Sequence, residues 1–167
     1  PSVAVCDAAL TRDEARLTIK NVLDSPGMSY EIFKRLAERK ITVDMIVQNI
    51  GMESRADVSF TVPSNELRQA QKAIEEALPL VDATEVTCDD AVAKVSVVGI
   101  GMEQQSGIAE RMFAALATAG INIQMITTSE IKISCLVQRS EATQALRAVH
   151  QAFGLHNKPA DANQWTI

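Results

Sequence analysis

The hexapeptide ITVDMI at Ile41–Ile46 recurs as INIQMI at Ile121–Ile126, with glutamine in place of the aspartate. Gly27 and Gly107 show the same spacing of 80 positions, and each precedes a helical pattern that leads into the hexapeptide. A match over this length predicts that a unit of about 80 residues has been duplicated. The fold should therefore contain the same structural unit twice.

The hydrophobic period changes in a fixed order along the first copy. Leu17 and Ile19 alternate with polar neighbours as in a strand, and Ser25-Pro26-Gly27 then predicts an N-cap, a first-turn proline and a flexible helix entry. A hairpin and a second helix follow. The expected elements are strands at Val43–Ile50, Ala56–Val62 and Thr84–Cys88, and helix stripes at Ile32, Phe33, Leu36 and Ala37 and at Leu67, Ala70, Ile74, Ala77 and Leu78.

The second copy repeats this order but lacks a closing strand. After Phe153 the chain shows no alternation and is rich in loop formers. Ser2–Asp7 resembles the closing strand of the first copy, so we expect the N-terminus to cross over and complete the second unit. The elements expected here are strands at Lys94–Gly99, Ile123–Thr128 and Ile131–Val137 and helices at Ile108–Ala117 and Glu141–Phe153.

The pattern is β-α-β-β-α-β twice. It predicts an α+β chain of two ferredoxin-like units in tandem, with antiparallel sheets that carry their helices on one face. The expected domains are residues 14–90 and residues 91–155, the second completed by the N-terminal strand at 1–8. Residues 156–167 are expected to form a C-terminal tail.

Composition narrows the classes of function. The formal charge of −5, with one Trp and one Tyr, is unsuited to binding a phosphate backbone or stacking bases, so no nucleic-acid partner is expected. The apolar runs are too short to cross a bilayer, and no signal-peptide pattern opens the sequence, so we expect no membrane partner. Three cysteines without a C-x-x-C pair indicate neither a disulfide framework nor a zinc site. A reducing, cytoplasmic setting fits best.

No catalytic or metal centre is expected. The two histidines are His150, beside the apolar stripe of the last helix, and His156, in the tail, and ordinary surface positions explain both. Cys6, Cys88 and Cys135 fall in strands, where cysteine commonly acts as a small apolar residue.

A glycine-containing loop, GIGMEQQSG at Gly99–Gly107, joins a strand to a helix. Gln104 stands where the dinucleotide fingerprint needs a third glycine, and no lysine follows as in a P-loop. With both nucleotide motifs excluded, the loop still provides a helix start whose exposed N–H groups suit a carboxylate. Ser25-Pro26-Gly27 provides the same feature in the first copy. A plain strand-to-helix turn is the competing interpretation.

The polar residues of the two hexapeptide regions favour a ligand. An ordinary buried strand does not need the polar groups of DMIVQN at Asp44–Asn49 or of QMITTSE at Gln124–Glu130. They are typical of the polar side of a small-molecule site. A helix start that faces such groups suits an amino acid, which carries a carboxylate and an ammonium on adjacent atoms.

These residues resemble the ACT domain, a regulatory module that binds amino acids, and in detail the tandem ACT region of the aspartate kinase family. The resemblance extends to about Phe153. The motifs that carry it are Asp24-Ser25-Pro26-Gly27, Val43-Asp44-Met45-Ile46-Val47-Gln48-Asn49 and Ile126-Thr127-Thr128-Ser129-Glu130-Ile131-Lys132-Ile133-Ser134.

The resemblance implies a role in regulation without catalysis. The family's enzyme phosphorylates aspartate with ATP and Mg²⁺ in a separate kinase domain, which has no counterpart in these residues. The chain therefore resembles either a regulatory β subunit or a C-terminal fragment, with a kinase domain or α subunit as partner. Two alternatives are an ACT-type regulatory subunit of another biosynthetic enzyme and a ferredoxin-like module for RNA or metal. The latter would need aromatic and basic residues on the sheet, or C-x-x-C.

The resemblance also implies feedback inhibition by threonine, with lysine as a candidate second effector. A lysine site needs an anion for the distal ammonium, and Asp44 or Glu130 could supply it. We expect a homodimer in which residues of different chains surround each ligand. The effector-binding candidates are Asp24, Ser25, Pro26, Gly27, Met28, Asp44, Met45, Gln48, Asn49, Ser106, Gly107, Ile108, Asn122, Ile123, Gln124, Ile126, Thr128, Ser129 and Glu130.

Overall fold

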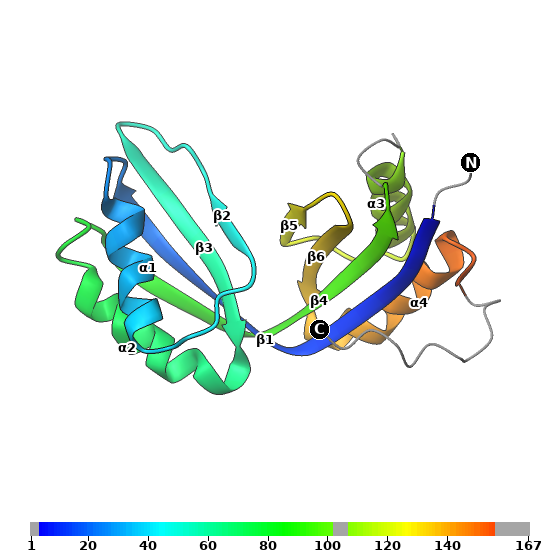
Figure 1. Ribbon diagram of the computed structural model, residues 1–167, viewed down its shortest axis with the longest axis horizontal. Coiled ribbons are helices and arrows are strands. Elements are labelled where there is room, and N and C mark those ends of the chain that lie inside the picture. Colours follow the sequence, from blue (N-terminus) through cyan, green and yellow to red (C-terminus); the bar gives the residue numbers. More distant parts are fainter. Residues whose placement is uncertain (1–3, 102–106, 156–167) are drawn as a thin grey trace.

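Two long strands run through the whole molecule. The structure, a computed structural model, describes residues 4–101 and 107–155. Its strands form one antiparallel sheet of six strands in the order β2-β3-β1-β4-β6-β5, with β1 (Ala4–Leu23) and β4 (Glu85–Ile100) at the centre (Figure 1). The sequence predicted two sheets and separate short strands in these places, and that detail is wrong. Each pair of predicted strands is fused into one, because the residues between them also pair.

The remaining elements follow the predicted order in both copies, which confirms the tandem α+β arrangement. The first copy contains α1 (Met28–Glu38), β2 (Ile46–Gln48), β3 (Arg55–Pro63), the short 3₁₀ helix η1 (Ser64–Glu66) and α2 (Leu67–Ala77). The second contains α3 (Ile108–Thr118), β5 (Met125–Thr128), β6 (Lys132–Gln138), η3 (Arg139–Glu141) and α4 (Ala142–Ala152). Among the residues that the structure describes, no helix combines the length and apolarity needed to cross a membrane.

β2 is shorter than the predicted strand at Val43–Ile50. Its flanks still bond to β3, since the Asp44 N–H donates to the Thr61 carbonyl (3.1 Å) and the Asn49 N–H to the Asp57 carbonyl (3.2 Å). Backbone bonding to β3 therefore reaches from Asp44 to Asn49, but only Ile46–Gln48 has regular strand pairing.

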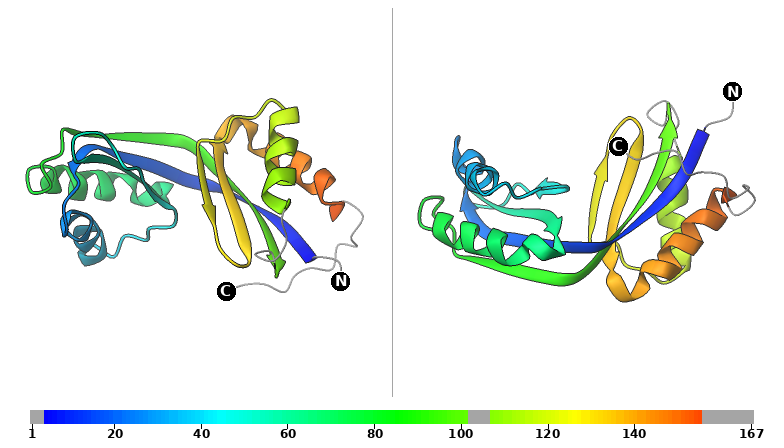
Figure 2. Two further views of the ribbon diagram at one scale, coloured as in Figure 1. Left: turned by 90° about the horizontal axis from the view of Figure 1, so that it is seen from above. Right: turned by 60° about the horizontal axis from the view of Figure 1, so that its bottom comes forward.

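The N-terminal half of β1 completes the second unit, as the sequence predicted. Ala4 lies opposite Ile100 and Ala8 opposite Val97, whereas the C-terminal half pairs with the start of β4, Ile19 lying opposite Val86. Figure 2 shows β1 and β4 side by side from one half of the molecule to the other. The predicted domain limits at residues 14 and 90/91 fall inside these two strands, so that division remains a prediction.

Two hydrophobic cores define the units. The first unit packs α1 and α2 on β1 and β3, and its largest buried side chains include Leu17, Ile32, Leu36 and Phe60. The second packs α3 and α4 on the other ends of β1 and β4, around Met112 and Leu116. The helix pairs lie on the outer sides of the two halves (Figure 1). Each helix also carries exposed residues on the side away from its core. We call the joint between the cores, around Glu14 and Val92, the waist.

The alternation of side chains changes at the waist. On β1, Leu17 and Ile19 enter the first core, whereas Ala8 and Leu10, at positions of the opposite parity, belong to the second. The pairing of β1 with β4 is irregular between Thr11 and Arg16, with an extra residue on each strand. Because an extra residue reverses which face later side chains point to, these bulges let one strand serve two cores.

Arg139 supplies hydrogen bonds where the ladder is interrupted. Its Nε donates to the carbonyl of Arg12 (2.9 Å) and lies 3.3 Å from that of Val92, while Nη2 donates to the carbonyl of Glu14 (2.9 Å). A buried carbonyl without a donor is costly, and the rigid guanidinium fork can reach several at once. One side chain from the second unit therefore holds both long strands at the waist.

The repeated hexapeptides meet at this joint. Met45 and Met125 occupy the same place in the two copies, and together with Val92 and Leu136 they form a third, small core. β2 and β5, the two ends of the strand order, consequently lie near each other where the two halves face each other (Figure 1). The methionine of each hexapeptide thus has a structural role in joining the units.

Deleting residues 1–8 should open the second unit first. The deletion removes the part of β1 that pairs with Val97–Ile100, together with Ala8 from the second core. We expect amide exchange in α3 and α4 to accelerate while α1 and α2 keep their protection, measured by hydrogen-exchange mass spectrometry. Thermal unfolding and exchange identical to those of the full chain would contradict this account of β1.

Candidate functional site

Both helix starts have the same unusual backbone. Gly27 is the N-cap of α1 with φ 96°, and Gly107 is the N-cap of α3 with φ 98°. A Cβ at Gly27 would have no atom within 4 Å, so the positive φ and not crowding calls for glycine. The predicted N-cap role of Ser25 is wrong: no side chain caps α1, and Pro26 precedes the cap. The Ser25 carbonyl instead accepts from the Met28 N–H (3.2 Å).

In the first unit the helix start and the edge strand come together. Ser29, in the first turn of α1, donates from Oγ to Oε1 of Gln48 on β2 (3.0 Å). The residues at 24–27 are exposed beside this contact. The first turn of a helix has backbone N–H groups without intrahelical partners and a positive dipole end. The arrangement therefore places anion-binding groups next to an amide that can both donate and accept.

Three other candidates of the first copy have side-chain partners elsewhere in the chain. Asp44 forms an ion pair with Lys94 of β4. Met45 is buried in the small core of the waist. Asn49 accepts from the Asp57 N–H through Oδ1 (2.6 Å). These side chains are engaged in contacts within the chain.

Among the described residues, the helix start of the second unit has no counterpart of the Ser29–Gln48 contact. Gly107 is exposed, Ile108 is buried in the second core, and Ser106 lies outside the described residues. Thr128 on β5 is exposed and corresponds to Gln48, but the residue that corresponds to Ser29 is Ala109. The two helix starts therefore have different polar groups near them.

The candidates around β5 fall into a buried group and an exposed group. Gln124 donates to Oε1 of Gln138 (3.3 Å), and its own Oε1 is buried without a partner among the described residues. Ile123 packs against the second core. Exposed side chains occupy the edge and the turn after it: Asn122, Ile126, Ser129 and Glu130.

Glu14 and Lys94 were missed by the sequence analysis. Lys94 Nζ lies 3.7 Å from Glu14 Oε1 as well as in contact with Asp44. Burial raises the pKa of Glu14, the charge of Lys94 opposes this, and Asp44 adds to it. The one signal in the sequence was a lysine within the mostly apolar stretch at residues 91–98. Nothing in the pattern showed which side chains it would meet.

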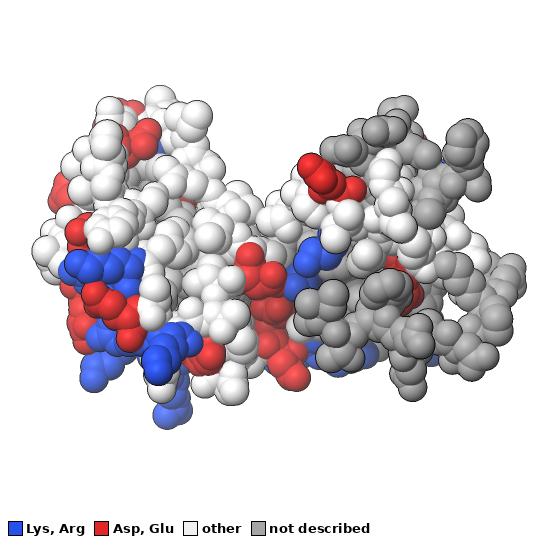
Figure 3. Space-filling view, viewed as in Figure 1, with Lys and Arg blue, Asp and Glu red and all other residues white. Residues whose placement is uncertain are grey.

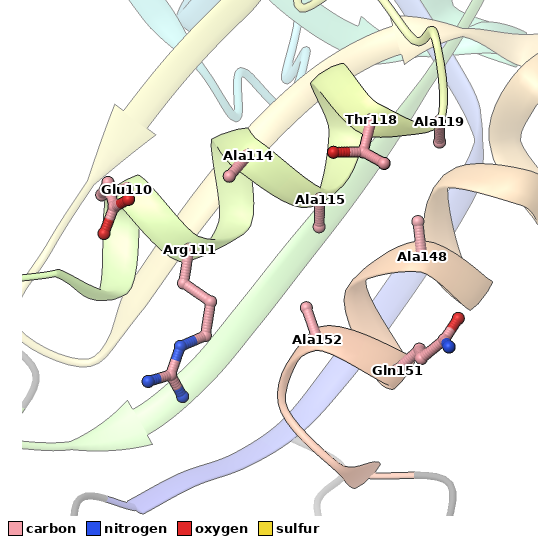
Figure 4. Close-up of a pocket in the computed structure, with 9 residues that line it drawn as sticks. All are labelled: Glu110, Arg111, Ala114, Ala115, Thr118, Ala119, Ala148, Gln151 and Ala152. Atoms are coloured by element: carbon pink, nitrogen blue, oxygen red, sulfur yellow. The ribbon is translucent and has the colours of Figure 1, made fainter.

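Two hollows lie elsewhere on the surface. A groove of about 610 Å³ runs between α3 and α4, where Ala115 and Ala119 face Ala148 and Ala152 (Figure 4). A polar hollow of about 340 Å³ lies on the sheet of the first unit, and in it Lys20 pairs with Asp57 (3.3 Å). The space-filling view also shows the depression between the two halves (Figure 3). Within residues 4–101 and 107–155, no three side chains gather as metal ligands.

Comparison with known proteins gives the family. The family model of the ACT domain matches residues 20–78 and 95–153, once in each unit. The aspartate kinase of Pseudomonas fluorescens (strain SBW25) is 46% identical over 147 residues, which are 88% of this chain and 36% of that protein. The chain belongs to the aspartate kinase family, as its regulatory tandem ACT region. It spans a little over a third of the length of that relative.

Solved structures agree with this assignment. The regulatory subunit of aspartate kinase from Thermus thermophilus, in a ligand-free form, matches with a TM-score of 0.83 and 40% identity over 87% of this chain and 96% of that one. A chain from a structure of aspartokinase alpha and beta subunits matches with a TM-score of 0.85 and 41% identity, over 90% of this chain and 99% of that one. The aspartate kinase family is therefore favoured over another ACT-regulated enzyme.

The glycine at the start of the first ACT helix can be tested by substitution. Gly27→Ala should destabilise the ACT region by about 1 kcal/mol or more, because an L-residue is strained at this φ. Ser25→Ala is the matched control and should change the free energy of unfolding by less than about 0.5 kcal/mol, since Ser25 makes no cap. Urea denaturation measures both. A larger loss for Ser25→Ala than for Gly27→Ala would contradict the observed cap.

Proposed function

We propose that this chain binds amino-acid effectors and transmits feedback inhibition to an aspartate kinase catalytic domain. The contact of Ser29 with Gln48 carries the proposal, because it brings a helix start and an edge strand of one ACT unit together. The membership of the aspartate kinase family supports it.

Threonine is the proposed first effector. Its carboxylate suits the exposed N–H groups at the start of α1, and its ammonium and hydroxyl can bond to Gln48. Lysine is proposed as a second effector, with Glu130 or Asp44 as the anion for its distal ammonium. The unequal polar groups of the two units support unequal preferences for the two amino acids.

The catalytic step is proposed to belong to another part of the enzyme. The chain alone should not transfer phosphate from ATP to aspartate, and ATP and Mg²⁺ would bind the kinase domain or α subunit. Effector binding would favour one arrangement of the ACT units, and the attached or docked kinase domain would respond to it. The proposed setting is the cytoplasm, in the pathway from aspartate to lysine and threonine.

A homodimer is proposed to complete the effector sites. β2 and β5 form the two edges of the sheet, and exposed Ile46 (49%) and Ile126 (42%) lie on them. An unpaired edge with apolar side chains favours pairing with another chain. Each effector would then contact the helix start and Gln48 of one chain and, in addition, an edge strand of its partner.

Threonine binding should depend on Gln48. We expect Gln48→Ala to weaken threonine binding about tenfold, as the loss of a hydrogen bond to a charged ligand implies. Gln71→Ala is the matched control, because Gln71 lies on α2, where its Nε2 donates to Oε1 of Glu75 (3.0 Å). Isothermal titration calorimetry measures both affinities. Absence of binding heat for threonine with the unaltered chain would refute the threonine assignment.

The oligomeric state provides an independent check. Sedimentation velocity should show a dimer, and Ile46→Lys should shift it toward the monomer and weaken threonine binding in parallel, because a charge on an edge strand opposes pairing. Lys72→Glu, on the exposed face of α2, should leave both unchanged. A monomer that binds threonine with undiminished affinity would exclude a site shared between chains.

A further inference from the structure

Three charged side chains from three separate segments meet at the waist. Glu14 comes from β1, Lys94 from β4, and Asp44 from the segment that leads into β2. Lys94 contacts Asp44, and its Nζ lies 3.7 Å from Glu14 Oε1. The exposed fraction of the side chain is 12% for Lys94, 35% for Asp44 and 8% for Glu14. The cluster therefore links the edge of the first unit to the central strand of the second.

The charges of this cluster do not balance. Two carboxylates share one ammonium, and Glu14 Oε2 is buried with no hydrogen-bond partner in the described part of the chain. A buried anionic oxygen without a donor is costly, and a proton removes that cost. Burial also raises the pKa of Glu14, with Asp44 adding to the effect of burial and Lys94 opposing it.

Among the described residues, no other group packed around Glu14 supplies a second cation to its carboxylate. Pro63 of β3 and Val92 of β4 lie opposite Glu14 and are apolar. Arg139 of η3 bonds to the backbone carbonyl of Glu14 (2.9 Å). Arg16, two positions along β1, pairs with Asp89 (3.3 Å).

The neighbours on the β6 side and along β1 do not change this balance. Gln138 and Gln124 are neutral and bond to each other. Arg12 contacts Thr143, and Asp13 is exposed. Within the described part of the chain, Lys94 is thus the cation that both carboxylates of the cluster have within reach.

The cluster exists on one side of the duplication only. Aligning Ala15–Ile19 with Ala93–Val97 makes Glu14 equivalent to Val92, which lies directly opposite it across the two strands. Gln124 likewise replaces Asp44. Since valine occupies the equivalent position in the other copy, the fold does not itself require a carboxylate there.

We propose that Glu14, Lys94 and Asp44 form a proton-operated latch between the two units. When Glu14 is protonated, the Lys94 ammonium pairs with Asp44 alone. This ion pair holds the segment ahead of β2 against β4. When Glu14 releases its proton to solvent, its carboxylate competes with Asp44 for the same ammonium. The hold on Asp44, and through it on the start of β2, then weakens.

Carbon-13 NMR of the side-chain carboxyls tests the latch on the unaltered chain. Glu14 should titrate above the exposed glutamates, and the chemical shift of the Asp44 carboxyl carbon should change over the same pH range as that of Glu14. An Asp44 signal that does not respond to the titration of Glu14 would overturn the proposal, as would a Glu14 signal that titrates with the exposed glutamates. The measurement needs no effector, so it is independent of the proposed threonine site.

Amide exchange reports the movement of the segment. The Thr61 N–H is bonded to the Met45 carbonyl (3.0 Å), directly after Asp44. After correction for the intrinsic pH dependence, its exchange should accelerate about threefold or more as Glu14 ionises. In Glu14→Gln, which keeps the shape and stays neutral, this acceleration should be lost. Equal acceleration in the unaltered chain and in Glu14→Gln would overturn the latch.

The pH dependence of stability gives a second readout with a matched control. The folded state binds the Glu14 proton more tightly than the unfolded chain does, because the pKa of Glu14 is raised above its ordinary value of 4.5 in the folded protein. The contribution of Glu14 to the free energy of unfolding therefore falls as pH rises from 4.5 through the raised folded pKa. Glu14→Gln should lose that decline, whereas Asp13→Asn, on the same strand but exposed, should keep it. If Glu14→Gln does not fold, Glu14→Val carries the side chain of the equivalent position and should lose the decline as well. A decline retained in whichever variant folds would count against the proposal.

Discussion

Backbone hydrogen bonding at the waist is the constraint on which the rest of the structure depends. β1 and β4 each pass from one hydrophobic core to the other, and each needs an extra residue there to keep its apolar side chains directed at the helices. Those extra residues interrupt the ladder and leave carbonyls in need of donors. Arg139 meets this need by bonding to the carbonyls of both strands, and it also reaches Ser64 Oγ (3.3 Å).

The shared strands have consequences for how the two ACT units can move. Neither unit has a complete sheet of its own, because β1 and β4 contribute to both. A change in one unit is therefore transmitted through continuous backbone as well as through the contacts of Met45 and Met125. Such coupling is what an effector-binding region needs if a distant catalytic domain is to respond.

The methionine that the two hexapeptides share and the position where Asp44 is replaced by Gln124 have separate structural roles. The methionines meet in the small core between the units. The position that differs is polar and lies beside that core, where Asp44 pairs with Lys94 and Gln124 bonds to Gln138. One copy therefore carries charge at the joint and the other does not. The difference between the copies affects the joint directly, whatever its effect on ligand preference.

Local patterns in the sequence were enough for much of the fold. The duplicated period, the order of strands and helices, the glycines at both helix starts and the crossing of the N-terminal strand all follow from features that act over a few residues or from the repeat itself. The proximity of the α1 start to Gln48 follows from the same order, since β2 returns along the helix that precedes it.

Tertiary structure alone decided the fusion of the strands and the composition of the waist. Strand alternation shows which side chains leave the helix-covered face, but it carries no information about which distant segment covers them. Lys94 was therefore visible as a polar residue, while its partners Asp44 and Glu14 are 50 and 80 positions away along the chain. The bulges could not be predicted from the sequence for the same reason. A residue is an extra residue only relative to the neighbouring strand, and the sequence pattern does not show which strand that is.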